Sequence, residues 1–201
     1  MADASGGRVG PAVEHRPVRR RRAVFVDRDG TLNPDLRYLR EAERLELYRG
    51  VPEAVRLLHR HGFVVVCVTN QSGVERGFYT EADVARIHAR VNERLAESGE
   101  RLDAFYHCPH APESACRCRK PGTLLFERAR DDLGLSMAGS AVIGDRSIDV
   151  EAGEKLGLLT VLVPSRGHAR EVARELAERS VRADLVAPSF LAAAVRVLHR
   201  G

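Results

Sequence analysis

The sequence predicts an α/β fold in which helices cover both faces of a doubly wound parallel sheet. Short apolar runs rich in valine alternate with segments of helical periodicity along most of the 201 residues, and this alternation is typical of strands joined by crossover helices. Polar residues follow directly after several of the apolar runs. In open α/β sheets the working groups lie at the carboxyl ends of the strands, so these polar residues mark the expected site.

Length and charge indicate one domain with a separate N-terminal segment. A hydrophobic fraction of 44% and a charged fraction of 30% are ordinary for a globular protein, and the length suits one domain better than two. The net charge of +4 lies in residues 1–22, which contain six arginines and two acids, while residues 23–201 contain 26 basic and 26 acidic residues. We expect residues 1–22 to be a disordered basic tail and residues 23–201 to form the domain. A neutral domain does not favour a nucleic-acid partner.

The sequence also predicts where the protein resides. No apolar run approaches the roughly 20 residues that a membrane-spanning helix needs, and the N-terminus lacks the apolar core of a signal peptide. We therefore expect a cytoplasmic protein without a membrane partner.

The first strand leads into a pair of acids. The apolar residues 23–26 predict a strand that is buried on both faces, and Asp27 and Asp29 follow it. In extended backbone, positions i and i+2 point to the same side, so both carboxylates can face one pocket. Two adjacent acids repel each other unless a cation lies between them or one holds a proton. The pair therefore suits a divalent metal with a nucleophile and an acid/base, although a surface turn with two solvated acids is the alternative.

The later elements follow from periodicity and end signals. Residues 33–50 have no strong period and predict a loop or a small β-flap, and a helix is expected from Val51 until Gly62. A buried strand covers 63–70, and Thr80 with Asp83 predicts a capping box at the start of the next helix. The remaining expected elements are a strand at 103–107, a helix from Pro121 to Leu133, a strand at 140–145, a helix at 148–156, a strand at 158–163, a helix at 168–180, a strand at 183–186 and a helix at 190–199.

Polar groups at four places in this order indicate one chemistry. After the acid pair, the second strand ends in Thr69-Asn70-Gln71-Ser72, the loop after the third ends in Arg119-Lys120, and the fourth ends in Asp145-Arg146. Taken singly, each segment is explained as an ordinary strand end or solvated turn. Together, an acid pair, a hydroxyl with amides, a lysine and a further acid are what magnesium-assisted phosphoryl transfer requires.

These segments resemble the four motifs of the haloacid dehalogenase-like phosphohydrolases, beginning with the Asp-x-Asp-x-Thr signature at residues 27–31. The resemblance implies that Asp27 is the nucleophile and Asp29 the acid/base. It further implies that Thr69 holds a phosphoryl oxygen, that Lys120 offsets charge, and that Asp27, the backbone carbonyl of Asp29 and Asp145 bind Mg²⁺. Asp149 lies one helical turn beyond Asp145, and we expect it beside the metal ligands rather than among them, as a helix-surface acid.

The four cysteines divide into two kinds. Cys67 lies within an apolar strand and predicts a small buried side chain, whereas Cys108, Cys116 and Cys118 share one loop with His110. Three thiolates and one imidazole make a closed tetrahedral site for a structural zinc ion. A disulfide is the rival interpretation, but it would leave one loop cysteine unpaired. His107 is a weaker candidate ligand because it ends a strand.

Over roughly residues 23–165, the complete set of motifs resembles the D-glycero-D-manno-heptose 1,7-bisphosphate 7-phosphatases and the related histidinol-phosphate phosphatases. The resemblance implies a capless enzyme, a monomer by default, that acts on a small phosphorylated sugar. Two features depart from it, since the segment between His110 and Cys116 is short and Arg146 stands where lysine is common. The alternatives are a histidinol-phosphate phosphatase and, more distantly, a nucleic-acid 3′-phosphatase. The implied substrate contacts are Asp35, Tyr38, Thr69, Asn70, Gln71, Ser72, Arg119, Lys120 and Arg146.

Overall fold

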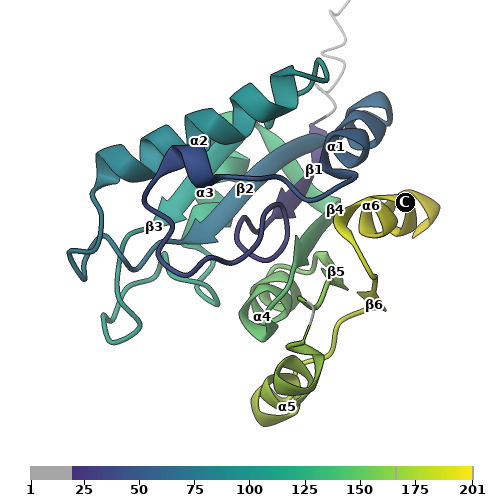
Figure 1. The fold of residues 1–201 in the computed structure, drawn as a ribbon. Helices are drawn as coiled ribbons and strands as arrows, with labels where there is room; N and C mark the ends of the chain where they lie inside the picture. The colour runs from purple at the N-terminus through teal and green to yellow at the C-terminus, as the bar shows by residue number, and fades with distance from the viewer. Residues whose placement is uncertain (1–19, 166, 201) are drawn as a thin grey trace, which may run out of the picture.

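A computed structural model describes residues 20–165 and 167–200 (Figure 1). Six strands form one sheet in the order β3-β2-β1-β4-β5-β6, and every neighbouring pair is parallel. Helices lie on both faces, so the predicted doubly wound α/β fold is confirmed. The elements are β1 (Arg21–Val26), η1 (Ala42–Arg44), α1 (Val51–Arg60), β2 (Val64–Asn70), α2 (Glu81–Ala96), β3 (Ala104–Cys108), α3 (Leu124–Leu133), β4 (Leu135–Gly144), α4 (Ser147–Lys155), β5 (Leu159–Leu162), α5 (Ala169–Arg179), β6 (Leu185–Val186) and α6 (Phe190–Arg200).

The strand order reverses between β1 and β4. The chain passes from β1 outward through β2 to β3, then returns to β4 on the other side of β1 and continues through β5 to β6. The loops after β1 and β4 therefore diverge to opposite faces, which opens a crevice at the carboxyl ends of these two strands. The backbone N–H of Asp27 donates to the carbonyl of Ile143 at 2.9 Å. The ends of the two strands are thus held side by side.

The central strands are buried on both faces because their side chains alternate between two apolar clusters. Val24 and Val26 of β1 pack into the cluster that includes residues of α1, α2 and α6. Ala23 and Phe25 pack into the cluster that includes residues of α3, where the ring of Phe25 meets Phe126 edge to face at 5.2 Å. Each fully buried side chain of this kind contributes about 1.5–3 kcal/mol to stability. This burial explains why residues 23–26 of β1 form an uninterrupted apolar run.

The sheet begins earlier than the sequence indicated. Arg21 and Arg22, which the sequence placed in the tail, are the first residues of β1 and pair with the start of β4. The guanidinium of Arg22 lies 4.4 Å from the centre of the Phe63 ring, a cation–π contact that explains how a strand accommodates arginine. The rest of the predicted tail, residues 1–19, lies outside the described residues.

Residues 33–50 form a loop with the short 3-10 helix η1, so the first of the two predicted alternatives, a loop and not a β-flap, is present.

Two other boundaries differ from the predictions. Helix α3 begins at Leu124 instead of Pro121, since the preceding residues form a tight turn in which the N–H of Gly122 donates to the carbonyl of Arg119 at 2.6 Å. Strand β4 starts at Leu135, directly after α3, instead of at Ser140.

Other local predictions are confirmed. The Thr80–Asp83 capping box is present at the start of α2, and Cys67 is fully buried within β2. Among the described residues, no helix has the length and apolar character that crossing a membrane requires.

Candidate active site

The strand-end residues identified from the sequence gather around one cavity of about 620 Å³. The ends of β1, β2 and β4, together with the loop between β3 and α3, form its walls. Its volume lies in the range of small-molecule sites. Every predicted catalytic, magnesium and substrate residue lines it, namely Asp27, Asp29, Asp35, Tyr38, Thr69, Asn70, Gln71, Ser72, Arg119, Lys120, Asp145 and Arg146.

Lys120 is the buried cation at the centre of this cavity. Its Nζ lies 2.6 Å from Asp27 Oδ1 and 2.6 Å from Asp149 Oδ1, and it donates to the carbonyl of Val68 at 2.7 Å. The contacts with Asp27 and Val68 are hydrogen bonds, and the contact with Asp149 is an ion pair. Burial opposes the charge, but the two carboxylates outweigh it and raise the pKa of Lys120 above its ordinary value. The lysine is therefore a fixed positive charge beside Asp27.

Three buried carboxylates lie close together here, and two of them contact the ammonium group of Lys120. Oxygen atoms of Asp27, Asp145 and Asp149 lie within 4.8 Å of one another. Burial, followed by repulsion from the neighbouring acids, raises the pKa of both Asp27 and Asp145. Asp145 Oδ1 is buried and has no hydrogen-bond partner among the described residues. An excess of negative charge, hard oxygen donors and a free carboxylate oxygen are features that Mg²⁺ prefers, so these residues fit a divalent cation.

Asp149 lies beside Asp27 and Asp145, but it is buried and not exposed on the helix surface. Asp149 is 2% exposed, and its Oδ2 accepts a hydrogen bond from the backbone N–H of Arg146 at 3.1 Å. Gly144 makes this approach possible, because a Cβ atom at that position would stand 2.2 Å from Asp149 Cγ. The carboxylate is therefore held against Lys120, where it fixes the lysine in place.

Asp29 is held by a network that the sequence analysis missed. Its two oxygens accept hydrogen bonds from Arg28 at 3.2 and 2.7 Å, from Asn33 Nδ2 at 3.0 Å and from Gln71 Nε2 at 2.9 Å. Arg28 is fully buried. Burial by itself would raise the pKa of Asp29, but the charge and hydrogen bonds of Arg28 outweigh it and lower the pKa. The sequence did contain a sign of this network. Arg28 lies between two acids in a buried motif, and buried arginines are nearly always paired with an acid.

The residues after β2 organise the site from the other side. Gln71 donates to Thr69 Oγ1 at 2.9 Å, and its Oε1 accepts from Tyr79 at 2.8 Å. Asn70 accepts from the backbone N–H of Lys120 at 3.0 Å and donates to the carbonyl of Lys120 at 3.2 Å. Asn70 and Gln71 therefore hold Lys120, Thr69 and Asp29 in place, besides lining the cavity.

Two loops meet at the rim of the cavity. Arg76 donates to the hydroxyl of Tyr38 at 2.9 Å and pairs with Glu113 of the cysteine loop at 3.2 Å. The Tyr38 and Phe78 rings meet at 4.5 Å. Tyr38 has a φ of 34° and Arg37 a φ of 46°, values that side chains other than glycine rarely adopt. Such strain is typical of functional segments and is consistent with a substrate contact at Tyr38.

The predicted zinc ligands come together beside the cavity. The sulfur of Cys108 lies 3.7 Å from Cys116 Sγ, 3.1 Å from Cys118 Sγ and 3.5 Å from His110 Nδ1, and His110 Nδ1 lies 3.1 Å from Cys118 Sγ. Ligands of a tetrahedral zinc ion stand about 3.5–3.8 Å apart, given bonds of about 2.0–2.3 Å. All four cysteines are free, so no disulfide forms, and the four groups could bind a metal ion. His107 instead pairs with Glu81.

Two of the other predicted contacts, Arg119 and Arg146, are anchored to different parts of the chain. Arg119 donates to the carbonyl of His110 at 3.2 Å, which links it to the cysteine loop. Arg146 pairs with Glu175 of α5 at 2.5 Å. Both arginines line the cavity. Arg146 is held by the carboxylate of Glu175, whereas Arg119 is held by the backbone carbonyl of His110.

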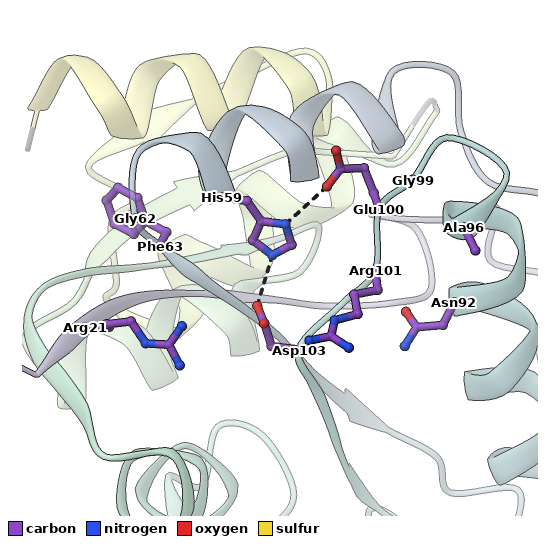
Figure 2. A pocket seen from close by; sticks show the side chains of 10 residues that line it. All are labelled: Arg21, His59, Gly62, Phe63, Asn92, Ala96, Gly99, Glu100, Arg101 and Asp103. Carbon is purple, nitrogen blue, oxygen red and sulfur yellow. Dashed lines mark hydrogen bonds and ion pairs between the residues drawn. The ribbon is translucent and has the colours of Figure 1, made fainter.

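A second hollow, of about 700 Å³, contains none of the predicted catalytic residues. Figure 2 shows His59 of α1 at its centre, with one ring nitrogen facing Glu100 and the other facing Asp103. The two distances are 3.2 and 3.0 Å. The hydrogen bonds that His59 donates to Asp103 and to Glu100 raise its pKa, although burial opposes this. This cluster ties α1 to the segment between α2 and β3.

Comparison with known proteins relates the chain to one group of phosphatases. The HAD-hydrolase-like family model matches residues 117–193. A probable D-glycero-D-manno-heptose-1,7-bisphosphate 7-phosphatase of Thermoplasma volcanium is 41% identical over 141 residues, covering 68% of this chain and 94% of its relative. The D-glycero-beta-D-manno-heptose-1,7-bisphosphate 7-phosphatase of Haemophilus ducreyi is 36% identical over 178 residues, covering 85% of this chain and 95% of its relative.

A solved structure supports the same relation. The D,D-heptose 1,7-bisphosphate phosphatase of B. bronchiseptica, complexed with magnesium and phosphate, superimposes with a TM-score of 0.79 at 28% identity. The superposition covers 90% of this chain and 99% of that one. The similarity therefore extends over the whole domain, including the ends of the strands where the cavity lies.

Proposed function

The chain belongs to the D-glycero-D-manno-heptose 1,7-bisphosphate 7-phosphatase family of haloacid dehalogenase-like hydrolases, and we propose that it hydrolyses the 7-phosphate of this sugar bisphosphate through an aspartyl-phosphate. The observation that carries the proposal is the buried contact of Asp27 with Lys120 at 2.6 Å, beside two further carboxylates. This arrangement supplies a nucleophile, a fixed positive charge and a cation site within one cavity.

In the first step, Asp27 attacks the phosphorus atom and the leaving sugar oxygen takes a proton from Asp29. Thr69 donates its hydroxyl to a phosphoryl oxygen, and Lys120 offsets charge on the nucleophile and the transferred group. The network around Asp29 favours its ionised form. A phosphate dianion arriving beside Asp29 favours the protonated form, because a like charge raises the pKa of a carboxylate.

In the second step, Asp29 removes a proton from the water that attacks the aspartyl-phosphate. The hydrogen bonds from Arg28, Asn33 and Gln71 hold both of its oxygens and favour the carboxylate that this step needs. The same residue therefore acts as acid and then as base.

A magnesium ion would be held by Asp27, the backbone carbonyl of Asp29 and Asp145. When bound, Mg²⁺ neutralises phosphate charge and orients the transferred group. The buried, unpartnered Oδ1 of Asp145 supports this assignment.

We assign a structural zinc ion to Cys108, His110, Cys116 and Cys118. Four protein ligands leave no position for a reactive water molecule. Cys118 is two residues before Lys120, and the zinc would hold Arg119 and Lys120 at the cavity wall. The substrate contacts proposed from the sequence remain proposals, and their shared cavity supports them.

Histidinol phosphate is the second candidate substrate, because the catalytic residues would serve it equally well. The named relatives favour the heptose bisphosphate. A nucleic-acid 3′-phosphatase is less favoured, since the domain carries no excess of basic residues.

The test is phosphate release from heptose 1,7-bisphosphate, histidinol phosphate and a 3′-phosphorylated oligonucleotide, each with MgCl₂. We expect the highest kcat/KM with the heptose bisphosphate and no activity of Asp27→Ala with any substrate. A preference for histidinol phosphate would reject the substrate assignment, and an active Asp27→Ala enzyme would reject the mechanism.

A further inference from the structure

The loop after β5 reaches Asp145, a residue of the cavity wall, through Ser165. The hydroxyl of Ser165 donates to Asp145 Oδ2 at 2.6 Å. Resting on the proposed function, which makes Asp145 a magnesium ligand, we propose that Ser165 is a positioning residue that orients the Asp145 carboxylate for the metal. No motif in the sequence pointed to this serine.

The two oxygens of Asp145 have different surroundings. Oδ2 accepts the hydrogen bond from Ser165, whereas Oδ1 is buried without a hydrogen-bond partner among the described residues. A carboxylate held by one oxygen cannot rotate freely about its Cβ–Cγ bond, so the other oxygen keeps a fixed direction. The contact therefore prepares Asp145 to bind a cation through Oδ1 alone.

Gly30 completes the contact by packing closely against both side chains. A Cβ atom at position 30 would lie 2.1 Å from Asp145 Oδ2 and 2.8 Å from Ser165 Oγ. The backbone of Gly30 also has a φ of 86°, which glycine adopts without strain. Three segments distant in sequence thus enclose one carboxylate oxygen, and Asp145 has little space for another rotamer.

A neutral hydroxyl suits this task better than a cation would. A lysine or arginine at Oδ2 would neutralise the carboxylate and weaken its attraction for Mg²⁺, while a serine hydroxyl orients it and leaves the negative charge in place. Partners that orient metal ligands in this way typically change metal affinity about 10–100-fold when removed.

The experiment measures magnesium binding without substrate, by isothermal titration calorimetry and by the rise in Tm with increasing MgCl₂. Ser165→Ala should bind Mg²⁺ about 10-fold more weakly than wild type, with an unchanged Tm in buffer without added MgCl₂. Ser165→Thr keeps the hydroxyl and should bind near wild type, and Ser165→Cys, a weak donor, should be intermediate. Activity should follow, with a higher MgCl₂ concentration for half-maximal rate and a near-normal kcat at saturating MgCl₂.

Two further variants serve as controls for the magnesium-binding measurement. Ser136→Ala is the matched control, because Ser136 also donates a hydrogen bond from a half-buried position, to the carbonyl of Ala138, and it should bind Mg²⁺ normally. Asp145→Ala should abolish the binding. Equal affinity of Ser165→Ala and wild type, with binding lost in Asp145→Ala, would overturn this inference alone. Magnesium binding that does not depend on Asp145 would overturn the proposed metal site as well.

Discussion

Replacing Lys120 with methionine tests the central claim about the site, because methionine keeps the length of the side chain and removes its charge. The ammonium of Lys120 is 3% exposed and contacts two carboxylates, each at 2.6 Å. Leaving a buried charge without its partner costs about 3–5 kcal/mol. In a chain of this size each kcal/mol of lost folding stability lowers Tm by about 2–4 °C, so the expected decrease in Tm is about 6–20 °C.

The lower part of this range is expected at neutral pH. Burial already raises the pKa of Asp27, so in the variant this carboxylate can take up a proton and reduce the cost. Catalysis should suffer more than stability. Removing one preorganised group that stabilises developing charge lowers kcat by about 10²–10³, and protonated Asp27 is also a poor nucleophile.

The chain offers a matched control, because its other lysine is Lys155. The Lys155 side chain is 49% exposed and pairs with Glu151 at 2.7 Å, so Lys155→Met should change stability by about 0.5 kcal/mol or less. Thermal unfolding and steady-state kinetics of both variants provide the measurement. If Lys120→Met kept more than a tenth of the wild-type kcat/KM, or unfolded at the same temperature as Lys155→Met, the proposed role of the buried lysine would be refuted.

Three further predictions concern the zinc loop, the β4 turn and the second hollow. Cys118→Ser should lose the zinc found in wild type by elemental analysis and lower kcat/KM by tenfold or more, and a zinc-free but fully active wild type would contradict this. Gly144→Ala should lower the free energy of unfolding by about 1–3 kcal/mol and reduce activity, because the added Cβ would overlap the Asp149 carboxylate. Normal activity of this variant would show that activity does not depend on the observed position of Asp149. The raised pKa of His59 means that its ionised form stabilises the fold below about pH 6.5, and that this stability is lost as the pH rises through the folded pKa. The stability difference between wild type and His59→Gln should therefore shrink between pH 6 and pH 9 in urea titrations, and a constant difference would argue against the ion pair with Asp103.

The sequence predicted the sheet and its polar edge well because both depend on local patterns. Apolar runs that end in Asp27, Thr69 and Asp145 specify buried strands and the groups that follow them, and parallel strands bring those groups to one edge of the sheet. The cysteine cluster was predictable for a similar reason, since its four members lie within one short loop.

Interactions between distant segments were not predictable in the same way. Asp149 has the spacing of a helix-surface acid, and its burial depends on Gly144 and on Lys120 from another loop. Ser165 resembles any serine in a loop until β5 is placed beside β4. Residues 33–50 contain a short alternating piece, so the sequence left a loop and a β-flap as alternatives, and the structure shows the loop with the helix η1.

The paired hydrogen bonds between Asn70 and the backbone of Lys120 have a consequence for how this enzyme family can change. Because the amide of Asn70 binds both the N–H and the carbonyl of Lys120, the lysine is fixed from the end of β2, independently of how many residues precede it. Lengthening a surface loop costs little free energy, about 0.6 kcal/mol for each doubling. The segment between His110 and Cys116 can therefore gain or lose residues while the ammonium group of Lys120 stays in place, so that this loop can change at the rim of the cavity without moving the lysine.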